Sequence, residues 1–176
     1  MKRFEAEGDG FQGRTVTGDE TWVHYNQPET KKASKVWRHT SPPKPKKFRT
    51  QPSAGKAMLT LFWDEQGVIL EHYMPRGNTV NSATYADLLK NHLRLAIKSK
   101  RRGLMSTSVL LQHDNDRPHT ARSTVATIQD LSYGCLPHPP YSPDLAPSDF
   151  HVFGPLKEAM GGKSFQVRRR GAAGGA

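Results

Sequence analysis

The chain has 176 residues, which fits one domain, and its 35% content of hydrophobic residues argues against a second globular core. Lys and Arg number 26 against 16 Asp and Glu, so the formal charge of +10 favours a polyanionic partner, nucleic acid ahead of a membrane surface. The lone Cys135 excludes an internal disulfide, and no run approaches the roughly 18 apolar residues of a membrane span, so we expect an intracellular protein without a membrane segment.

The first predicted strand lies within residues 14–25, where apolar residues interrupt a polar run. From residue 31 to residue 56 the composition changes to Lys, Pro, Ser and Thr, without an acidic residue. The prolines of this segment argue against a helix or a central strand, so we expect an extended basic loop. Two roles remain open for this loop, a solvated linker and an arm that binds phosphates or a partner.

A β-hairpin is expected next, because the apolar runs 57–63 and 68–74 flank a polar turn that ends in Gly67. Asn81 or Ser82 can cap a helix whose apolar residues recur at three- and four-residue steps up to Ile97. The remaining elements are a strand at 108–112, a helix from about 119 to 131, a strand at 133–136, and a helix at 150–160 with Phe153 and Leu156 facing inward. Together they predict an α/β fold, with a mixed sheet flanked by helices.

Three aspartates stand where secondary structure would expose them. Asp19 lies in the first strand, Asp114 directly follows a buried strand, and Asp149 is at a helix start. Carboxylates at such positions can converge at one edge of a sheet and ligate Mg²⁺ or Mn²⁺ through hard oxygen atoms. Two such ions, about 3.5–4 Å apart, can activate a water or a 3′-hydroxyl for phosphoryl transfer. Each aspartate alone also suits a turn or a helix cap, so spacing leaves both interpretations open.

The sequence around these aspartates is more specific than their spacing. The three motifs are Thr17-Gly18-Asp19-Glu20-Thr21-Trp22-Val23, then His113-Asp114-Asn115 with Arg117-Pro118-His119, then His138-Pro139-Pro140-Tyr141-Ser142-Pro143-Asp144-Leu145-Ala146-Pro147-Ser148-Asp149-Phe150-His151. In this order, from about Phe4 to Phe165, they resemble the signatures of mariner-family transposases. Thirty-four residues separate Asp114 from Asp149, which is the spacing of the mariner branch within the Tc/mariner group.

The resemblance implies an RNase H-like domain that cuts DNA at transposon ends and joins the freed 3′ ends to target DNA, with two Mg²⁺ or Mn²⁺ ions. It implies that Asp19 and Asp114 share the metals and that Asp149 is the third ligand. Asp144 matches a second Pro-Asp of the family motif that is not a ligand. Glu20 follows Asp19 on a strand, so its side chain is expected to point to the opposite face.

His113 and His119 allow two interpretations. They could act as a metal-binding or acid–base pair, or they could stack and form hydrogen bonds in a structural role, and we favour the structural role.

The family also carries a basic insertion between its early strands, which reaches the partner subunit of a dimer and touches transposon-end DNA. Residues 31–56 match its position, so the resemblance implies a homodimer and a nuclear, DNA-bound protein. The cations expected to contact DNA are Lys31, Lys32, Lys35, Arg38, Lys44, Lys46, Lys47 and Arg49. We divide the chain into a linker segment (1–13), a catalytic domain (14–165) and a disordered tail (166–176).

The chain departs from the family in three places. The two helix-turn-helix modules that precede the catalytic domain in full-length relatives are not found, so we expect weak selectivity for transposon ends. Asp116 replaces a small apolar residue, and after Phe165 an Arg-rich, Gly/Ala tail replaces the expected helical region. These departures keep a second interpretation open, a catalytically silent remnant that only binds DNA or dimerises.

Overall fold

The computed structural model describes residues 8–25, 55–75, 77–139, 142, 146–161 and 163. Most of the basic segment, Asp144 and the tail 166–176 therefore lie outside the described residues. The expected end of the basic loop is wrong by one residue, because Lys56 begins a strand and its ammonium lies 3.7 Å from the centroid of the Trp22 ring. Within the described ranges, no helix is both long enough and apolar enough to cross a membrane.

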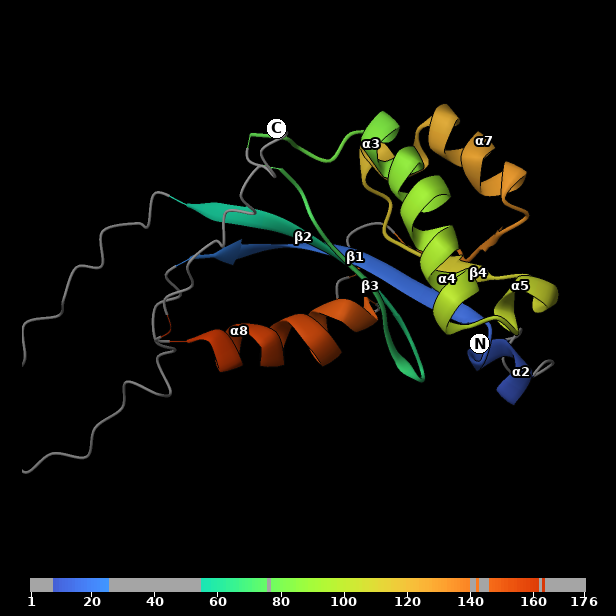
Figure 1. The fold of residues 1–176 in the computed structure, drawn as a ribbon, viewed down its shortest axis with the longest axis horizontal. Helices are drawn as coiled ribbons and strands as arrows, with labels where there is room; N and C mark the ends of the chain where they lie inside the picture. Colours follow the sequence, from blue (N-terminus) through green and yellow to red (C-terminus); the bar gives the residue numbers. More distant parts are fainter. Residues whose placement is uncertain are drawn as a thin grey trace, which may run out of the picture.

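Five strands form one mixed sheet in the order β3-β2-β1-β4-β5 (Figure 1). Strand β2 pairs antiparallel with β1 and with β3, whereas β4 runs parallel to β1 and to β5. The strands are β1 (Thr15–His24), β2 (Lys56–Asp64), β3 (Gly67–Tyr73), β4 (Leu110–Gln112) and β5 (Gly134–Cys135). The predicted hairpin and the predicted mixed sheet are both confirmed.

The β2–β3 turn is stabilised by the two residues that flank it. Gly67 has a φ of 115°, a backbone conformation that glycine adopts far more readily than other residues. Asp64, expected in the turn, is instead the last residue of β2 and is buried. Its carboxylate accepts a hydrogen bond of 2.9 Å from the backbone N–H of Gln66 and pairs with Arg101 at 2.7 Å.

Helices lie on both sides of the sheet. In Figure 1, α3, α4 and α7 gather on one side of the strands and α8 lies on the other. The first group comprises α3 (Ser82–Asp87), the π-helical segment η1 (Leu88–Leu93), α4 (Arg94–Lys100), α6 (Arg117–Thr120) and α7 (Arg122–Asp130). The second comprises the π-helical segment η3 (Ser148–Phe153) and α8 (Gly154–Met160), and the short helices are α2 (Asp9–Gln12) and α5 (Leu104–Thr107).

Asn81, one of the two predicted caps, begins the first long helical run. Its side chain accepts a hydrogen bond from the N–H of Thr84, and the Thr84 hydroxyl accepts one from the N–H of Asn81, both at 2.9 Å. This reciprocal pair satisfies two backbone donors that a helix start leaves unpaired.

The single helix expected at 119–131 is wrong, because α6 and α7 are separate helices with an extended residue, Ala121, between them. The hydroxyl of Thr124 donates a hydrogen bond of 2.6 Å to the carbonyl of Pro118. In a continuous helix that carbonyl would accept from the N–H of Arg122. The side-chain bond therefore competes with the helical ladder and favours the break.

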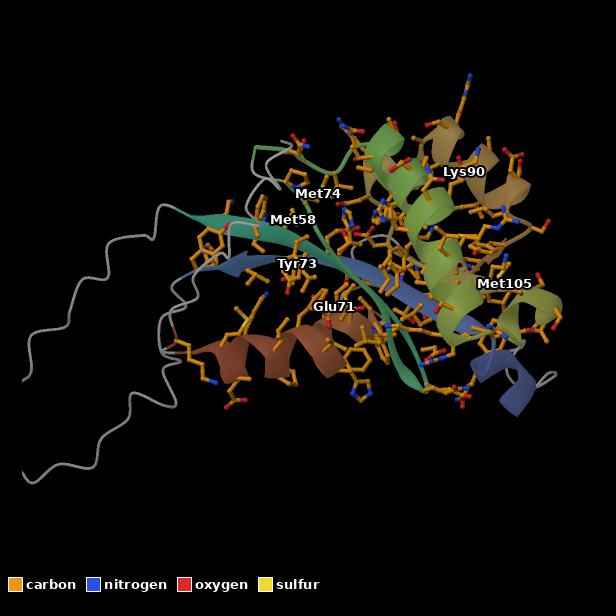
Figure 2. All side chains as sticks on the ribbon, in the orientation of Figure 1. Met58, Glu71, Tyr73, Met74, Lys90 and Met105 are labelled. Atoms are coloured by element: carbon orange, nitrogen blue, oxygen red, sulfur yellow. The ribbon has the colours of Figure 1, made fainter. Side chains whose placement is uncertain are left out.

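The hydrophobic core lies between the sheet and the α3–α4 layer. Its most completely buried side chains include Val16, Phe62, Ile69, Tyr85, Leu89, Leu93, Ile97, Val109 and Leu111. Burying one side chain of this size contributes about 1.5–3 kcal/mol. On the other face Phe153 is buried and Leu156 is half-buried, as expected. Figure 2 shows Met58 and Met74 at the end of the sheet away from α4, where the Met74 N–H bonds to the Met58 carbonyl at 2.9 Å.

Candidate active site

Asp19 lies in β1, the central strand of the sheet, where it pairs with Leu61 of β2. Its carboxylate accepts a hydrogen bond of 2.7 Å from the backbone N–H of Glu20. The preceding Gly18 faces the ring of Phe62, and a Cβ atom at Gly18 would lie 2.3 Å from that ring. A glycine is therefore required for β1 to approach the buried Phe62 and to hold Asp19 where it is.

Asp114 follows β4 and comes close to Asp19 because of strand register. The two strands run parallel, with Thr17 opposite Gln112, so the residues two positions further along each strand lie at the same end of the sheet. The Asp114 Oδ1 atom accepts a hydrogen bond of 3.1 Å from the backbone N–H of Asp116 and lies 2.5 Å from His119 Nδ1. Asp114 is thus fixed by a local turn and by a histidine.

Asp149 is the second residue of η3, the segment that leads into α8. Its neighbour Ser148 is fully buried, and the Ser148 hydroxyl accepts a hydrogen bond of 3.0 Å from the indole Nε1 of Trp63 in β2. The backbone N–H of Asp149 donates to the carbonyl of Ala146 at 3.1 Å. Strand β2 therefore positions the segment that carries the third aspartate.

The three aspartates line one cavity of about 520 Å³. They come from β1, from the end of β4 and from η3, segments far apart in the sequence. Asp144, which the resemblance excludes as a ligand, lies outside the described residues. The other described residues that line the cavity are Asn115, Asp116, Arg117, His138, Pro139, Ser142 and Ala146.

Burial and, to a smaller extent, the neighbouring carboxylates perturb the pKa of Asp19 in this cavity. Burial raises the pKa of Asp19 from 3.8 to about 7, partly opposed by the hydrogen bond from Glu20, and the charges of Asp149, Glu20 and Asp114 raise it further. Burial also raises the pKa of Asp114, but the hydrogen bonds from His119 and Asp116 outweigh it and lower that pKa. A divalent cation would relieve this repulsion, and carboxylate oxygens are the ligands that Mg²⁺ and Mn²⁺ prefer, so these residues fit such an ion.

The carboxylates share the cavity without being drawn together into a compact ligand set. Across the described part of the chain, no group of three or more His, Cys, Asp or Glu side chains is arranged to hold a metal ion. Asp116 is exposed and lines the same cavity, so the residue that departs from the family motif faces the site.

His119 connects the cavity to the other face of the sheet. It is buried, and besides its contact with Asp114 its Nε2 lies 3.4 Å from Glu20 Oε2, an ion-pair distance rather than a well-formed hydrogen bond. Burial lowers the pKa of His119, but the contacts with Asp114 and Glu20 outweigh it and raise the pKa to about 10. Strand alternation predicts that Glu20 points away from Asp19, but it does not indicate that Glu20 contacts His119. Its spacing from His119 gives no local signal of their contact.

His113 takes a structural position. Its Nδ1 lies 3.0 Å from the Tyr85 hydroxyl, its Nε2 lies 3.3 Å from Cys135 Sγ, and its ring stacks on that of His119 at 5.0 Å between centroids. Burial lowers the pKa of His113 to about 4, and the charge of His119 acts in the same direction. Stacking and hydrogen bonding by these histidines agree with the interpretation favoured from the sequence.

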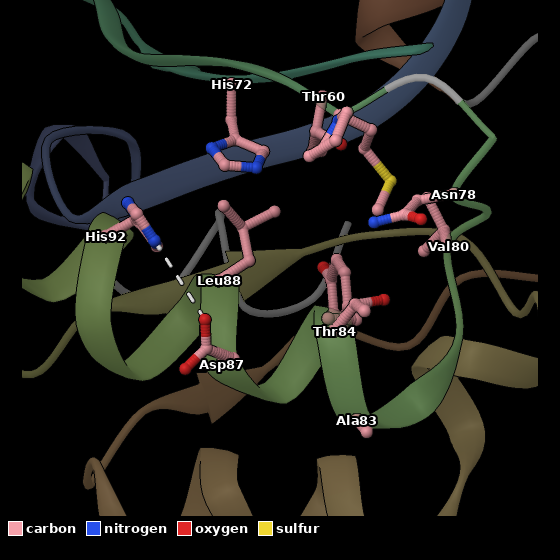
Figure 3. A pocket seen from close by; sticks show the side chains of 12 residues that line it. Thr60, His72, Asn78, Val80, Ala83, Thr84, Asp87, Leu88 and His92 are labelled. Carbon is pink, nitrogen blue, oxygen red and sulfur yellow. Dashed lines mark ion pairs between the residues drawn. The ribbon is translucent and has the colours of Figure 1, made fainter. Parts of the chain in front are cut away.

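A second pocket, of about 370 Å³, lies between β3 and the α3–η1 run and contains none of the three aspartates (Figure 3). In Figure 3, His92 pairs with Asp87 at 3.9 Å, and the ring of His72 points toward this pair from the sheet. The His72 and His92 ring centroids are 5.0 Å apart. Because Asp19, Asp114 and Asp149 line the first cavity and not this pocket, the first cavity is the candidate active site.

The mixed five-stranded sheet with flanking helices matches the RNase H-like fold that the family resemblance implied. A family profile described as "Transposase (partial DDE domain)" matches residues 27–107. The crystal structure of the catalytic domain of Mos1 mariner transposase superposes with a TM-score of 0.72 at 33% identity, covering 95% of this chain and 69% of that one. A pre-cleavage Mos1 transpososome gives a TM-score of 0.83 at 35% identity, over 95% of this chain and 48% of that one.

Among curated proteins, mariner Mos1 transposase from Drosophila mauritiana is 38% identical over 159 residues, which is 88% of this chain and 44% of the relative. The human histone-lysine N-methyltransferase SETMAR is 34% identical over 163 residues, 88% of this chain and 22% of the relative. The chain belongs to the mariner family of transposases and corresponds to their catalytic domain. It spans less than half the length of these two relatives. Solved Mos1 complexes include the catalytic domain with raltegravir and Mg, and with raltegravir and Mn.

Proposed function

We propose that this chain carries out metal-dependent cleavage of DNA and strand transfer, with Asp19, Asp114 and Asp149 holding two Mg²⁺ or Mn²⁺ ions. The observation that carries the proposal is the convergence of three carboxylates on one cavity in a chain of the mariner family.

The side chains around the cavity have distinct roles in this proposal. Divalent cations in such sites supply a nucleophile at neutral pH and neutralise charge on the phosphodiester. Arg117 lines the cavity and would bind a phosphate of the DNA backbone. The side-chain amide of Asn115 donates a hydrogen bond to the carbonyl of His138, which fixes the chain segment at the cavity rim.

DNA is the proposed substrate and partner. Mos1 transposase is known in a paired-end complex with the left transposon end and in a strand transfer complex, at 36% identity to this chain in each case. The net charge of +10 supports a phosphate-rich partner, because cationic side chains release the counterions condensed on DNA.

We further propose that the protein is a homodimer, that it is nuclear, and that the basic segment 31–56 binds DNA. Within this segment, Lys44, Lys46, Lys47 and Arg49 contribute to DNA contacts that do not depend on base sequence. The composition of the segment and its position between β1 and β2 support this role. A DNA substrate supports the nuclear location.

A nicking assay tests the catalytic proposal. The unaltered chain should nick supercoiled DNA with Mn²⁺, weakly and with little sequence preference, and should fail with EDTA. Asp114→Ala should abolish nicking while DNA affinity stays the same or rises slightly, because a negative charge is removed from the DNA-facing cavity. Asp130→Ala, which alters an exposed carboxylate of α7, should keep both properties.

The same assay decides on the alternative of a silent remnant that only binds DNA or dimerises. A folded chain that binds DNA but is inert in both Mg²⁺ and Mn²⁺, equally with and without Asp114→Ala, would leave that alternative standing. Nicking that persists in the Asp114→Ala variant would contradict the site assignment.

A further inference from the structure

We propose that His119 is a positioning residue that fixes the carboxylate of Asp114 for metal binding and is itself anchored by Glu20. This inference rests on the proposed function. The His119 Nδ1 atom lies 2.5 Å from Asp114 Oδ1, and its Nε2 lies 3.4 Å from Glu20 Oε2. One imidazole therefore joins a carboxylate of the cavity to a carboxylate on the opposite face of β1.

The His119 ring is held in one orientation by its neighbours. Its residue is 3% exposed, and its ring centroid lies 4.1 Å from that of Tyr85 and 5.0 Å from that of His113. The Tyr85 hydroxyl is bonded in turn to His113, and the backbone N–H of His119 donates to the carbonyl of Asp116 at 2.9 Å. A ring held in this way restricts the angle at which Asp114 can meet a cation.

Glu20 provides the second anchor. Its side chain is 14% exposed, and its Oε1 atom is buried without a hydrogen-bond partner among the described residues. His119 Nε2 is the polar atom that faces the other oxygen of this buried carboxylate, so removing the imidazole leaves Glu20 without that neighbour. Glu20 thereby fixes the imidazole from the face of the sheet that the cavity does not reach.

His119 acts through Asp114 and not as a metal ligand. Both of its ring nitrogens already face carboxylate oxygens, so neither is directed toward the open cavity. The described lining of the cavity includes Asp114 but not His119. Partners of this kind orient the ligand and commonly change metal affinity by about 10–100-fold when they are removed.

Two substitutions separate the two contacts of the ring. Asparagine places its amide N–H near the position of the imidazole Nδ1, whereas glutamine places its amide N–H near that of Nε2. His119→Asn therefore retains a donor toward Asp114, and His119→Gln retains one toward Glu20. His92→Gln is the matched control, because His92 also pairs with an aspartate, Asp87, but is exposed and lines the other pocket.

The measurement is Mn²⁺ binding by the full chain without DNA, followed through the electron paramagnetic resonance signal of free Mn²⁺. We expect His119→Gln to weaken binding by about tenfold or more, His119→Asn to weaken it less, and His92→Gln to leave it unchanged. Thermal unfolding in EDTA establishes that each variant is folded. If His119→Asn is unfolded because Glu20 has lost its partner, the double variant His119→Asn, Glu20→Gln takes its place.

Three outcomes are decisive. The expected order of affinities supports positioning of Asp114, since general destabilisation would not distinguish the two substitutions by their donor atoms. Mn²⁺ affinity of a folded His119→Gln variant equal to that of the unaltered chain would overturn the inference and leave the proposed function intact. If the unaltered chain binds Mn²⁺ no better than the Asp114→Ala variant does, the proposed function is overturned, and the inference with it.

Discussion

The indole of Trp63 donates a hydrogen bond of 3.0 Å to the hydroxyl of Ser148, and this bond joins β2 to the helix start that carries Asp149. The two residues are 85 positions apart in the sequence. Ser148 is fully buried, so its hydroxyl depends on this partner within the fold. The third aspartate of the cavity is thus placed by a polar contact made one residue before it.

Trp63→Phe keeps an aromatic ring but removes the donor. We expect the free energy of unfolding to fall by about 1–3 kcal/mol, because the Ser148 hydroxyl is left buried and unpaired. Mn²⁺-dependent nicking should fall as well, since Asp149 follows Ser148. Ser148→Ala should cost a similar amount, and the double variant should cost less than the sum of the two single variants. Additive losses in urea unfolding would show that the bond does not couple the two residues.

The raised pKa of Asp19 predicts a pH dependence of stability in metal-free buffer. In the folded chain this carboxyl keeps its proton up to about pH 7, whereas in the unfolded chain it loses the proton near its ordinary value of 3.8. The unfolded state therefore binds fewer protons between these values, and the Asp19 contribution to stability falls as pH rises from about 4 to about 7.

The comparison that isolates this effect is with Asp19→Asn, which does not titrate. We expect the variant to gain stability relative to the unaltered chain as pH rises through this window, with no further gain above it. Adding Mn²⁺ at pH 8 should stabilise the unaltered chain more than the variant, because the cation favours the charged carboxylate. A difference in melting temperature that is constant with pH would contradict the raised pKa.

Arg101 and Asp64 form a bidentate ion pair that ties the end of α4 to the end of β2. The Arg101 Nε and Nη2 atoms lie 2.7 and 3.1 Å from the two Asp64 oxygens, and the Asp64 side chain is 2% exposed. Arg101→Met should lower the free energy of unfolding by about 3–5 kcal/mol, because it leaves a buried carboxylate without its cation. Arg102→Met, at the exposed neighbouring position, should change it by less than about 0.5 kcal/mol. Equal effects in denaturant titrations would rule out a stabilising role for the pair.

The basic segment predicts a specific change in salt dependence. Replacing Lys44, Lys46, Lys47 and Arg49 with Ala should weaken binding to all DNA sequences alike and should flatten the dependence of affinity on salt. The slope falls by about 0.9 for each DNA phosphate that the protein no longer neutralises. A control that removes the same charge alters four exposed cations elsewhere, Lys90, Lys98, Arg102 and Arg122. If both quadruple variants show the same slope, net charge explains binding and the segment is a linker.

Local sequence patterns were sufficient to predict the hairpin, the helix cap and the family of this protein. Two apolar runs around a polar turn predicted the β2–β3 hairpin, and a polar pair before an apolar periodic run predicted a cap at Asn81 or Ser82, of which Asn81 is the cap. The motifs around Asp19, Asp114 and Asp149 identified the family, because each motif consists of particular residues at short, fixed spacings that the sequence itself displays. Each of these features depends on residues close together in sequence.

Only the tertiary structure decided which side chains meet. The contact between Glu20 and His119 depends on the parallel register of β1 against β4, and no local pattern encodes that register. The break between α6 and α7 depends on a side-chain hydrogen bond that competes with the helical ladder, which apolar periodicity does not detect. The raised pKa of Asp19 likewise requires burial and neighbouring charges from η3 and from the end of β4. Sequence therefore identified the carboxylates, whereas packing between distant segments determined their environment and their partners.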